Sequence, residues 1–157
     1  MPASNAKTSN EPNTADREIV LTRIFDAPRE LVFEVWTKPE HLTHWWGPKG
    51  FTLPVCEVDL RPGGAFHFVM RGPDGKNYPF RGAFTKIAPP ERLVFQGTIH
   101  DERGHEALTT VTFANEDGRT KVTVHQSYNF ESDATRGAPV GWSQSLDRLA
   151  GLLRSMA

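Results

Sequence analysis

Six histidines are the residues in this sequence that could support a metal site or acid–base chemistry. His41 and His44 lie three residues apart in a predicted helix, close enough to share a metal ion. A zinc or iron site needs at least one more ligand, and Glu40 points away from both by helical phase. The others fall beside a predicted turn or on the predicted outer face of strands: His67, His100, His105 and His125. The sequence therefore predicts no metal and no cofactor.

Nucleophiles are present, but none stands in a recognisable catalytic setting. Cys56 lies in the apolar stretch LPVCEVDL, where a free cysteine usually behaves as a small buried hydrophobe. The serines lack the G-x-S-x-G pattern of a nucleophile elbow. Glu57 and Asp59 share one face of a predicted strand, a spacing common on exposed sheet surfaces. RPGG and RGPDG are predicted turns between strands rather than phosphate-binding loops before a helix. We therefore predict no catalytic residues.

Aromatic side chains are the remaining chemical feature, with 10 Phe, 4 Trp and 2 Tyr. They could all belong to the core, but pockets for apolar ligands are also lined by aromatic residues, with a few polar groups for orientation. The predicted lining residues are Trp45, Trp46, Phe66, Phe68, Met70, Phe80, Phe84, Phe95, Phe113 and Trp142. The residues predicted to orient a polar end of the ligand are Arg23, Arg81, Gln126 and Tyr128.

Trp45 and Trp46 stand side by side immediately before Gly47-Pro48, which ends a predicted helix. On consecutive helical positions the two indoles point about 100° apart. One can pack under a sheet while the other stands at a cavity mouth. The alternative is a structural plug in which both tryptophans fill the core.

Composition limits the class of protein. The 157 residues correspond to about one domain, with 18 basic and 19 acidic side chains. A formal charge of −1 argues against binding to nucleic acid or to an anionic membrane. No apolar run approaches the roughly 18 residues of a membrane span, and residues 1–16 lack the apolar core of a signal peptide. We expect a disordered tail over residues 1–16, a single domain over 17–157 and a cytoplasmic location.

The elements that must position these residues follow a simple order. A β-branched strand over residues 17–25 precedes helices predicted at 29–37 and 40–46. Six further strands, at 51–60, 65–71, 78–87, 92–100, 107–114 and 120–130, are joined mostly by short turns, which favours antiparallel pairing. Pro139 suits the start of a last helix, in which Trp142, Leu146, Leu149 and Leu153 form an apolar stripe. This order predicts an α+β fold.

Four stretches, in this order and spacing, resemble one family: TRIFDAPRELVFEVWTKPEHLTHWWGP, RPGGAFHFVMRGPDG, FRGAFTKIAPPERLVF and GWSQSLDRLAGLL. They look like the bacterial branch of the Hsp90-ATPase-activator-like group, within the START-like (Bet v 1-like, SRPBCC) superfamily. The resemblance covers residues 17–154. It implies a helix-grip fold, in which a curved antiparallel sheet of about six to seven strands wraps a long C-terminal helix and encloses a largely apolar cavity. Gly137 and Pro139 depart from the family's longer run and predict a kink or a late start of that helix.

Three functions fit this resemblance. We favour a non-catalytic module that holds a small apolar or aromatic molecule, for transport, sequestration or sensing. The first alternative is a cavity enzyme of the polyketide cyclase or lyase type, which works by positioning and one or two polar groups. The second is a protein-interaction module, by analogy to chaperone ATPase activators. The sequence leaves monomer and homodimer undecided.

Overall fold

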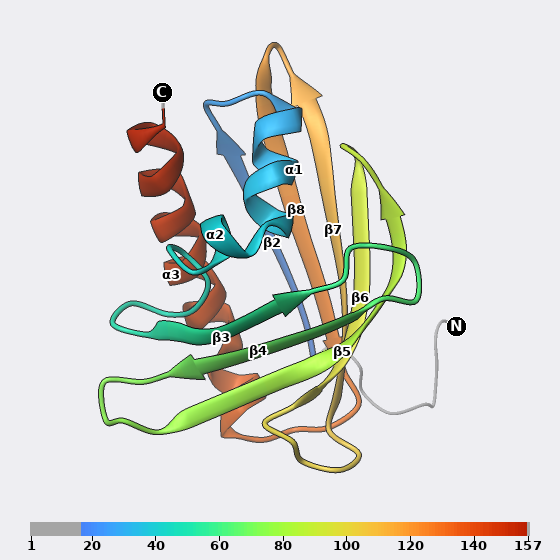
Figure 1. Cartoon of the computed structure of the whole chain (residues 1–157), viewed down its shortest axis with the longest axis vertical. Helices are drawn as coiled ribbons and strands as arrows, with labels where there is room; N and C mark the ends of the chain where they lie inside the picture. Colours follow the sequence, from blue (N-terminus) through green and yellow to red (C-terminus); the bar gives the residue numbers. More distant parts are fainter. Residues whose placement is uncertain (1–16, 157) are drawn as a thin grey trace.

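The computed structural model describes residues 17–156, and the predicted tail over residues 1–16 lies outside the described residues. The elements are β2 (Glu18–Phe25), α1 (Arg29–Thr37), α2 (Pro39–Leu42), β3 (Thr52–Val58), β4 (Ala65–Arg71), β5 (Asn77–Ala88), β6 (Arg92–Ile99), β7 (Glu106–Glu116), β8 (Arg119–Tyr128) and α3 (Asp133–Ser155). A curved antiparallel sheet wraps α3, and the two short helices lie at one end (Figure 1). The predicted α+β helix-grip fold is confirmed.

The sheet runs in the order β2-β8-β7-β6-β5-β4-β3, so that the first strand pairs with the last. Every neighbouring pair is antiparallel. Register shifts occur between Thr52 and Val55 on β3 and between Phe84 and Lys86 on β5. Irregularities of this kind bend a strand and increase its local twist, which helps the sheet to curve around the helix.

Gly82 on β5 and Gly97 on β6 are partners across the strand pair. A Cβ atom on Gly82 would lie 1.9 Å from the Gln96 carbonyl oxygen, and one on Gly97 would lie 2.7 Å from the Phe80 ring and 2.9 Å from the Phe66 ring. Both positions therefore require glycine, because phenylalanine rings and a neighbouring strand approach the backbone too closely for any side chain.

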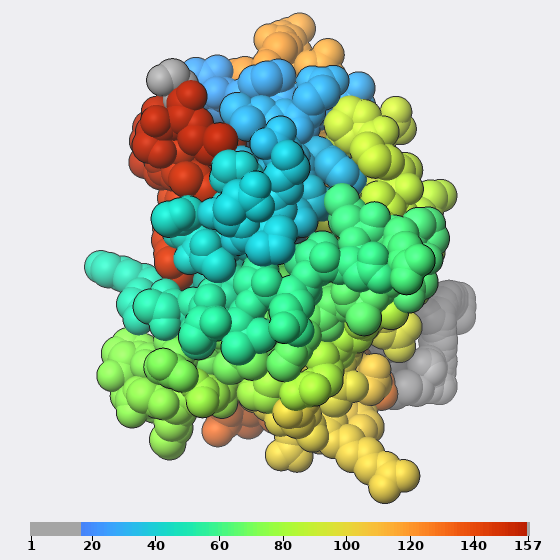
Figure 2. Space-filling model, in the orientation of Figure 1, coloured from blue at the N-terminus to red at the C-terminus, as the bar shows by residue number. Residues whose placement is uncertain are grey.

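The two short helices bring tryptophans into the core. Val32, Val35 and Trp36 are buried on one face of α1, as the helical spacing predicts. Trp45 is fully buried, its ring centroid lies 4.7 Å from that of Trp36, and its Nε1 donates to the Val35 carbonyl at 2.9 Å. The predicted helix over 40–46 ends early, at Leu42, and turns follow. On the face shown in Figure 2, α1, α2 and β3 cover the interior.

The long helix starts earlier than the sequence predicts. It begins at Asp133, where Ser132 and Thr135 form a reciprocal capping box, and Pro139 lies inside it. The prediction that Pro139 starts the helix is therefore wrong, because the capping box satisfies the first amides six residues earlier. A proline in a helix interior removes one backbone hydrogen bond but does not prevent the turn before it from forming. Within residues 17–156, no helix is both long enough and apolar enough to cross a membrane.

Candidate functional site: a pocket under the first turns of α3

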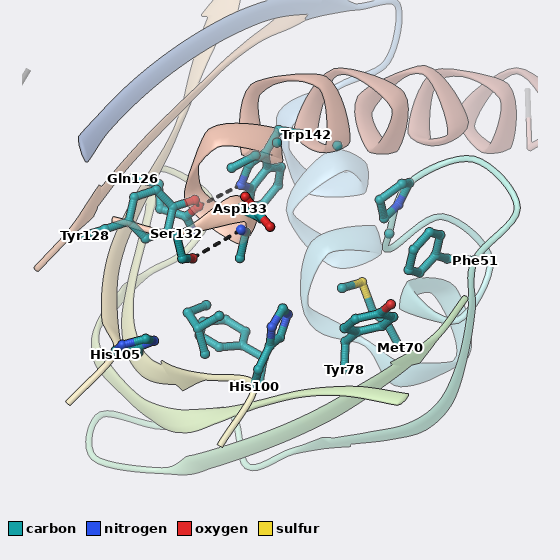
Figure 3. A pocket seen from close by; sticks show the side chains of 18 of the residues that line it. Phe51, Met70, Tyr78, His100, His105, Gln126, Tyr128, Ser132, Asp133 and Trp142 are labelled. Carbon is teal, nitrogen blue, oxygen red and sulfur yellow. Dashed lines mark hydrogen bonds between the residues drawn. The ribbon is translucent and has the colours of Figure 1, made fainter. Parts of the chain in front are cut away.

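A pocket of about 660 Å³ lies between the first turns of α3 and strands β4, β5, β6 and β8 (Figure 3). Pockets that hold drug-sized ligands have roughly this size, about 300–1,000 Å³. The loop after Trp46 forms one wall, and the segment between β8 and α3 forms another. The lining residues are Trp46, Gly47, Pro48, Phe51, Met70, Tyr78, Phe80, Ile99, His100, Glu102, His105, Gln126, Tyr128, Phe130, Ser132, Asp133, Ala134, Gly137, Ala138, Gly141, Trp142 and Ser145.

Small residues on α3 leave room for the pocket. Ala134, Gly137, Ala138 and Gly141 line it at positions i, i+3, i+4 and i+7, which is one face of a helix. A Cβ atom added to Gly137 would meet nothing within 4 Å. Further along α3 the buried face carries leucines instead, at 146, 149 and 153. The helix therefore fills the space under its second half and leaves the space under its first half open.

The wall formed by Gly47 and Pro48 is held in place by α3. The Arg148 guanidinium donates to the carbonyls of Gly47 at 3.0 Å and Pro48 at 3.2 Å, with longer contacts to the two carbonyls of His44 and Trp46. The Ser145 hydroxyl accepts from the Gly47 amide at 3.1 Å. Partial burial lowers the pKa of Arg148. These contacts satisfy carbonyls after α2 that no continuing helix would satisfy.

A buried polar network forms one end of the pocket. The Gln126 amide nitrogen donates to the Thr109 hydroxyl at 2.8 Å, and its oxygen accepts from Trp142 Nε1 at 3.0 Å and from the Tyr128 hydroxyl. Because an indole N–H can only donate, the oxygen of Gln126 must face Trp142. Burial raises the pKa of Tyr128, which keeps its phenol protonated. In Figure 3 this end lies opposite Phe51, Met70 and Tyr78.

Two histidines line the pocket on the side of the turn between β6 and β7. The His100 ring lies 5.1 Å from the Tyr78 ring, and His105 stacks on Phe130 at 4.1 Å. Burial lowers the pKa of His100, although the nearby carboxylate of Glu102 opposes part of the shift. His100 is therefore mainly neutral at pH 7 and can offer one donor and one acceptor nitrogen.

The predicted lining residues divide between the pocket and the solid core. Those that line the pocket are Trp46, Met70, Phe80, Trp142, Gln126 and Tyr128. Those that are buried in the core and do not line it are Trp45, Phe66, Phe68, Phe84, Phe95 and Phe113. Of the two adjacent tryptophans, Trp45 is a core residue and Trp46 contacts both regions. Binding by any of these residues remains a prediction.

The two arginines predicted to orient a ligand lie outside the pocket lining. Arg23 on β2 bonds to Asp147 at 2.8 Å and to the Ser143 hydroxyl at 2.9 Å, and so ties the edge strand to α3. Arg81 points away from the face that carries its neighbour Phe80 and pairs with Asp101 at 2.9 Å. Both guanidiniums are occupied by structural ion pairs.

Several lining residues escaped the sequence prediction. Tyr78 shares the strand parity of Phe80, so the period of two could have identified it. The small residues of α3 have the i, i+3, i+4, i+7 spacing of one helical face, but a helix predicted to start at Pro139 excludes three of the four. His100 and Phe130 end the strands predicted over 92–100 and 120–130, but the structure places both on irregular backbone after β6 and β8, where strand alternation does not report their orientation.

Two other candidates for chemistry, a shared metal site and the Cys56 thiol, find no support among residues 17–156. No group of three His, Cys, Asp or Glu residues that could share a metal occurs within residues 17–156. Cys56 is half-buried, and burial together with the charge of Glu57 raises the pKa of its thiol to about 12. A thiol of that pKa is scarcely ionised at neutral pH and is a poor nucleophile.

Comparison with known proteins agrees with the fold. Residues 26–154 match the family model described as "Activator of Hsp90 ATPase homolog 1-like protein". The fold and this match together place the chain among the START-like proteins. The chain belongs to the matched family, which is a branch of that superfamily. A comparison with functionally curated proteins gives no match.

Solved structures of bacterial proteins share the fold over almost their whole length. Protein CV1439 of Chromobacterium violaceum is 29% identical, with a TM-score of 0.81, and the match covers 87% of this chain and 96% of that one. Protein NE0264 of Nitrosomonas europaea is 27% identical, with a TM-score of 0.79 and coverage of 90% and 97%. A protein of Silicibacter pomeroyi that bears the family name is 25% identical, with a TM-score of 0.79 and coverage of 89% and 99%.

Proposed function

We propose that this chain binds a small apolar or aromatic molecule in the pocket under α3 and acts without catalysis, in transport, sequestration or sensing. The observation that carries this proposal is the pocket itself, about 660 Å³ in volume and walled by aromatic rings and by the small-residue face of α3. A domain that needed only a solid core would fill such a space, because close packing adds stability. The family's fold, which commonly encloses a ligand cavity, supports the same function.

Native mass spectrometry of the protein purified from its own cell extract tests the proposal on the physiological ligand. A reproducible added mass that disappears on denaturation is the expected result. In parallel, N-phenyl-1-naphthylamine, an uncharged dye that brightens in apolar surroundings, should bind one site per chain. Failure of both the extract and the dye to yield a bound species would contradict the proposal.

A cavity enzyme is the second candidate, and one observation favours it. Gln126, Tyr128 and His100 all line the pocket, and burial shifts the pKa values of the latter two. Shifted pKa values in a cleft are typical of active sites but also occur in structural networks. Chemical conversion of the bound molecule, lost in His100→Asn, would favour the enzyme. Release of the molecule unchanged after prolonged incubation would favour the binder.

We also propose a cytoplasmic location and a partner that is a small molecule rather than nucleic acid or membrane. The formal charge of −1 supports this, since a surface that binds nucleic acid or anionic lipid needs an excess of basic side chains. Fractionation of cells followed by detection of the chain tests the location. Recovery in the membrane pellet would contradict it.

A further inference from the structure

The charge around the pocket restricts what it can hold. Among the described residues that line it, none is lysine or arginine, while Glu102 and Asp133 contribute carboxylates. Both carboxylates are exposed, so they lie at the rim. Arg148, behind the wall of Gly47 and Pro48, is committed to four backbone carbonyls. A bound anion would therefore meet no lysine or arginine side chain in the lining, and the carboxylate of Glu102 at the rim would repel it.

The interior end of the pocket also carries no carboxylate that could pair with a cation. Gln126 is 4% exposed and Thr109 is fully buried, and the groups that hydrogen-bond to Gln126 are all uncharged. Asp133 already pairs with Arg136 at 2.7 Å. A charged group carried to the Gln126 end would lose its hydration without gaining an opposite charge, which is strongly unfavourable. An uncharged ligand avoids this cost.

The hydrogen-bond pattern at this end favours one polarity of ligand. The Tyr128 hydroxyl hydrogen is committed to the Gln126 oxygen, which also accepts from Trp142. The phenolic oxygen of Tyr128 keeps its own lone pairs, and Tyr128 lines the pocket. It can therefore accept a hydrogen bond from a ligand but cannot donate one without breaking the bond to Gln126.

Resting on the proposed function of the same pocket, we propose that it selects uncharged aromatic molecules that carry a hydrogen-bond donor, such as a phenol hydroxyl or an aromatic N–H, which donates to the Tyr128 oxygen. The ligand's rings pack on Trp46, Phe80 and Trp142, and its donor points toward β8. These ligands share a flat apolar ring system with a hydrogen-bond donor at one end.

A matched series of biphenyls tests this selectivity by isothermal titration calorimetry. 4-Hydroxybiphenyl is uncharged with a donor, 4-methoxybiphenyl lacks the donor, biphenyl-4-carboxylate is an anion and 4-(aminomethyl)biphenyl is a cation at pH 7. We expect the hydroxyl compound to bind about five- to tenfold more tightly than the methoxy compound, which is the effect of one net hydrogen bond. Both ions should bind more weakly than either neutral compound.

Two variants locate the donor's partner. Tyr128→Phe should abolish the preference for the hydroxyl over the methoxy compound. Ser127→Ala, which removes the hydroxyl of the preceding residue, should keep that preference, because Ser127 does not line the pocket. The wild-type comparison needs no variant, so it stands even if Tyr128→Phe fails to fold. Equal binding of all four compounds, or tightest binding of an ion, would overturn the selectivity and leave the proposed pocket function intact. Binding of none of them, nor of the naphthylamine dye, would instead overturn the proposed function.

Discussion

The space between the sheet and α3 has two halves that are lined by similar aromatic residues. One half is closely packed, and the other contains a pocket. Near α1 and α2, Trp36, Trp45 and Phe113 interlock, with ring centroids of neighbouring pairs 4.7 to 6.0 Å apart. Near the start of α3, rings such as Phe51 and Tyr78 surround a pocket. Aromatic content therefore does not distinguish a solid core from a cavity in this fold.

What differs is the surface that faces the rings. In the solid half, α1 packs on β7 and β8, α2 packs on β3, and α3 presents leucines. In the open half, α3 presents alanine and glycine to the pocket. Trp46 and Trp142 stand at the boundary, with ring centroids 5.4 Å apart. The size of the side chains on one helix, more than the sheet, determines where the cavity begins.

The largest expected effect on the free energy of unfolding comes from a substitution in the solid half. Trp45→Ala removes a fully buried indole and its hydrogen bond to Val35, so it should lower the free energy of unfolding by about 3–5 kcal/mol. Phe51→Ala should cost less than half as much, because the Phe51 ring is half-buried beside an existing pocket and its loss creates little new void. Urea denaturation of both variants measures the difference. Equal losses would contradict the division into a packed half and an open half.

A smaller effect is expected where the two halves join. Arg148→Ala leaves carbonyls after α2 without their guanidinium donor, and we expect a loss of about 1–3 kcal/mol in unfolding free energy. Arg154→Ala, in the exposed last turn of the same helix, should change it by no more than about 0.5 kcal/mol. Arg148→Lys should restore only part of the stability, because an ammonium can replace the contacts of one guanidinium nitrogen but not the second nitrogen's contact to the His44 carbonyl. Thermal melts of the three variants provide the check.

The smallest expected effect is on the pH dependence of stability, through His100 in the open half. Burial lowers the pKa of His100 in the folded state, so the unfolded chain takes up the proton more readily. The contribution of His100 to stability is complete above its unfolded pKa of roughly 6.5 and is lost as the pH falls below it. His100→Asn, which tolerates the positive φ of 55° at this position, should lose less stability than wild type between pH 7 and pH 5. Identical pH profiles would show that His100 is not responsible.

Most of the fold could be predicted from the sequence, whereas only part of the pocket could. Alternation along β4 places Phe66 and Phe68 on the buried face, and the spacing in α1 places Trp36 there. Periodicity reports which face is buried, but not whether the space beyond it is filled. Phe95 and Phe80 share a face of adjoining strands, yet only Phe80 reaches the pocket.

The start of α3 illustrates the same limit. Pro139 was the strongest local signal, but the capping pair Ser132 and Thr135 determines where the helix begins. A helix that starts at Pro139 would exclude the small residues before it, Ala134 and Ala138 among them. The hydrogen bonds of Gln126 also join β7, β8 and α3, and no spacing within one segment could have predicted them.

The most direct test of the central claim, that the small face of α3 creates a binding pocket, is to fill that pocket. Ala138→Leu should weaken binding of N-phenyl-1-naphthylamine at least about tenfold, as read from dye fluorescence, while the melting temperature stays the same or rises. Val140→Leu, which changes an exposed residue of the same helix outside the pocket lining, should bind the dye as wild type does. Undiminished binding by a folded Ala138→Leu protein would contradict the claim.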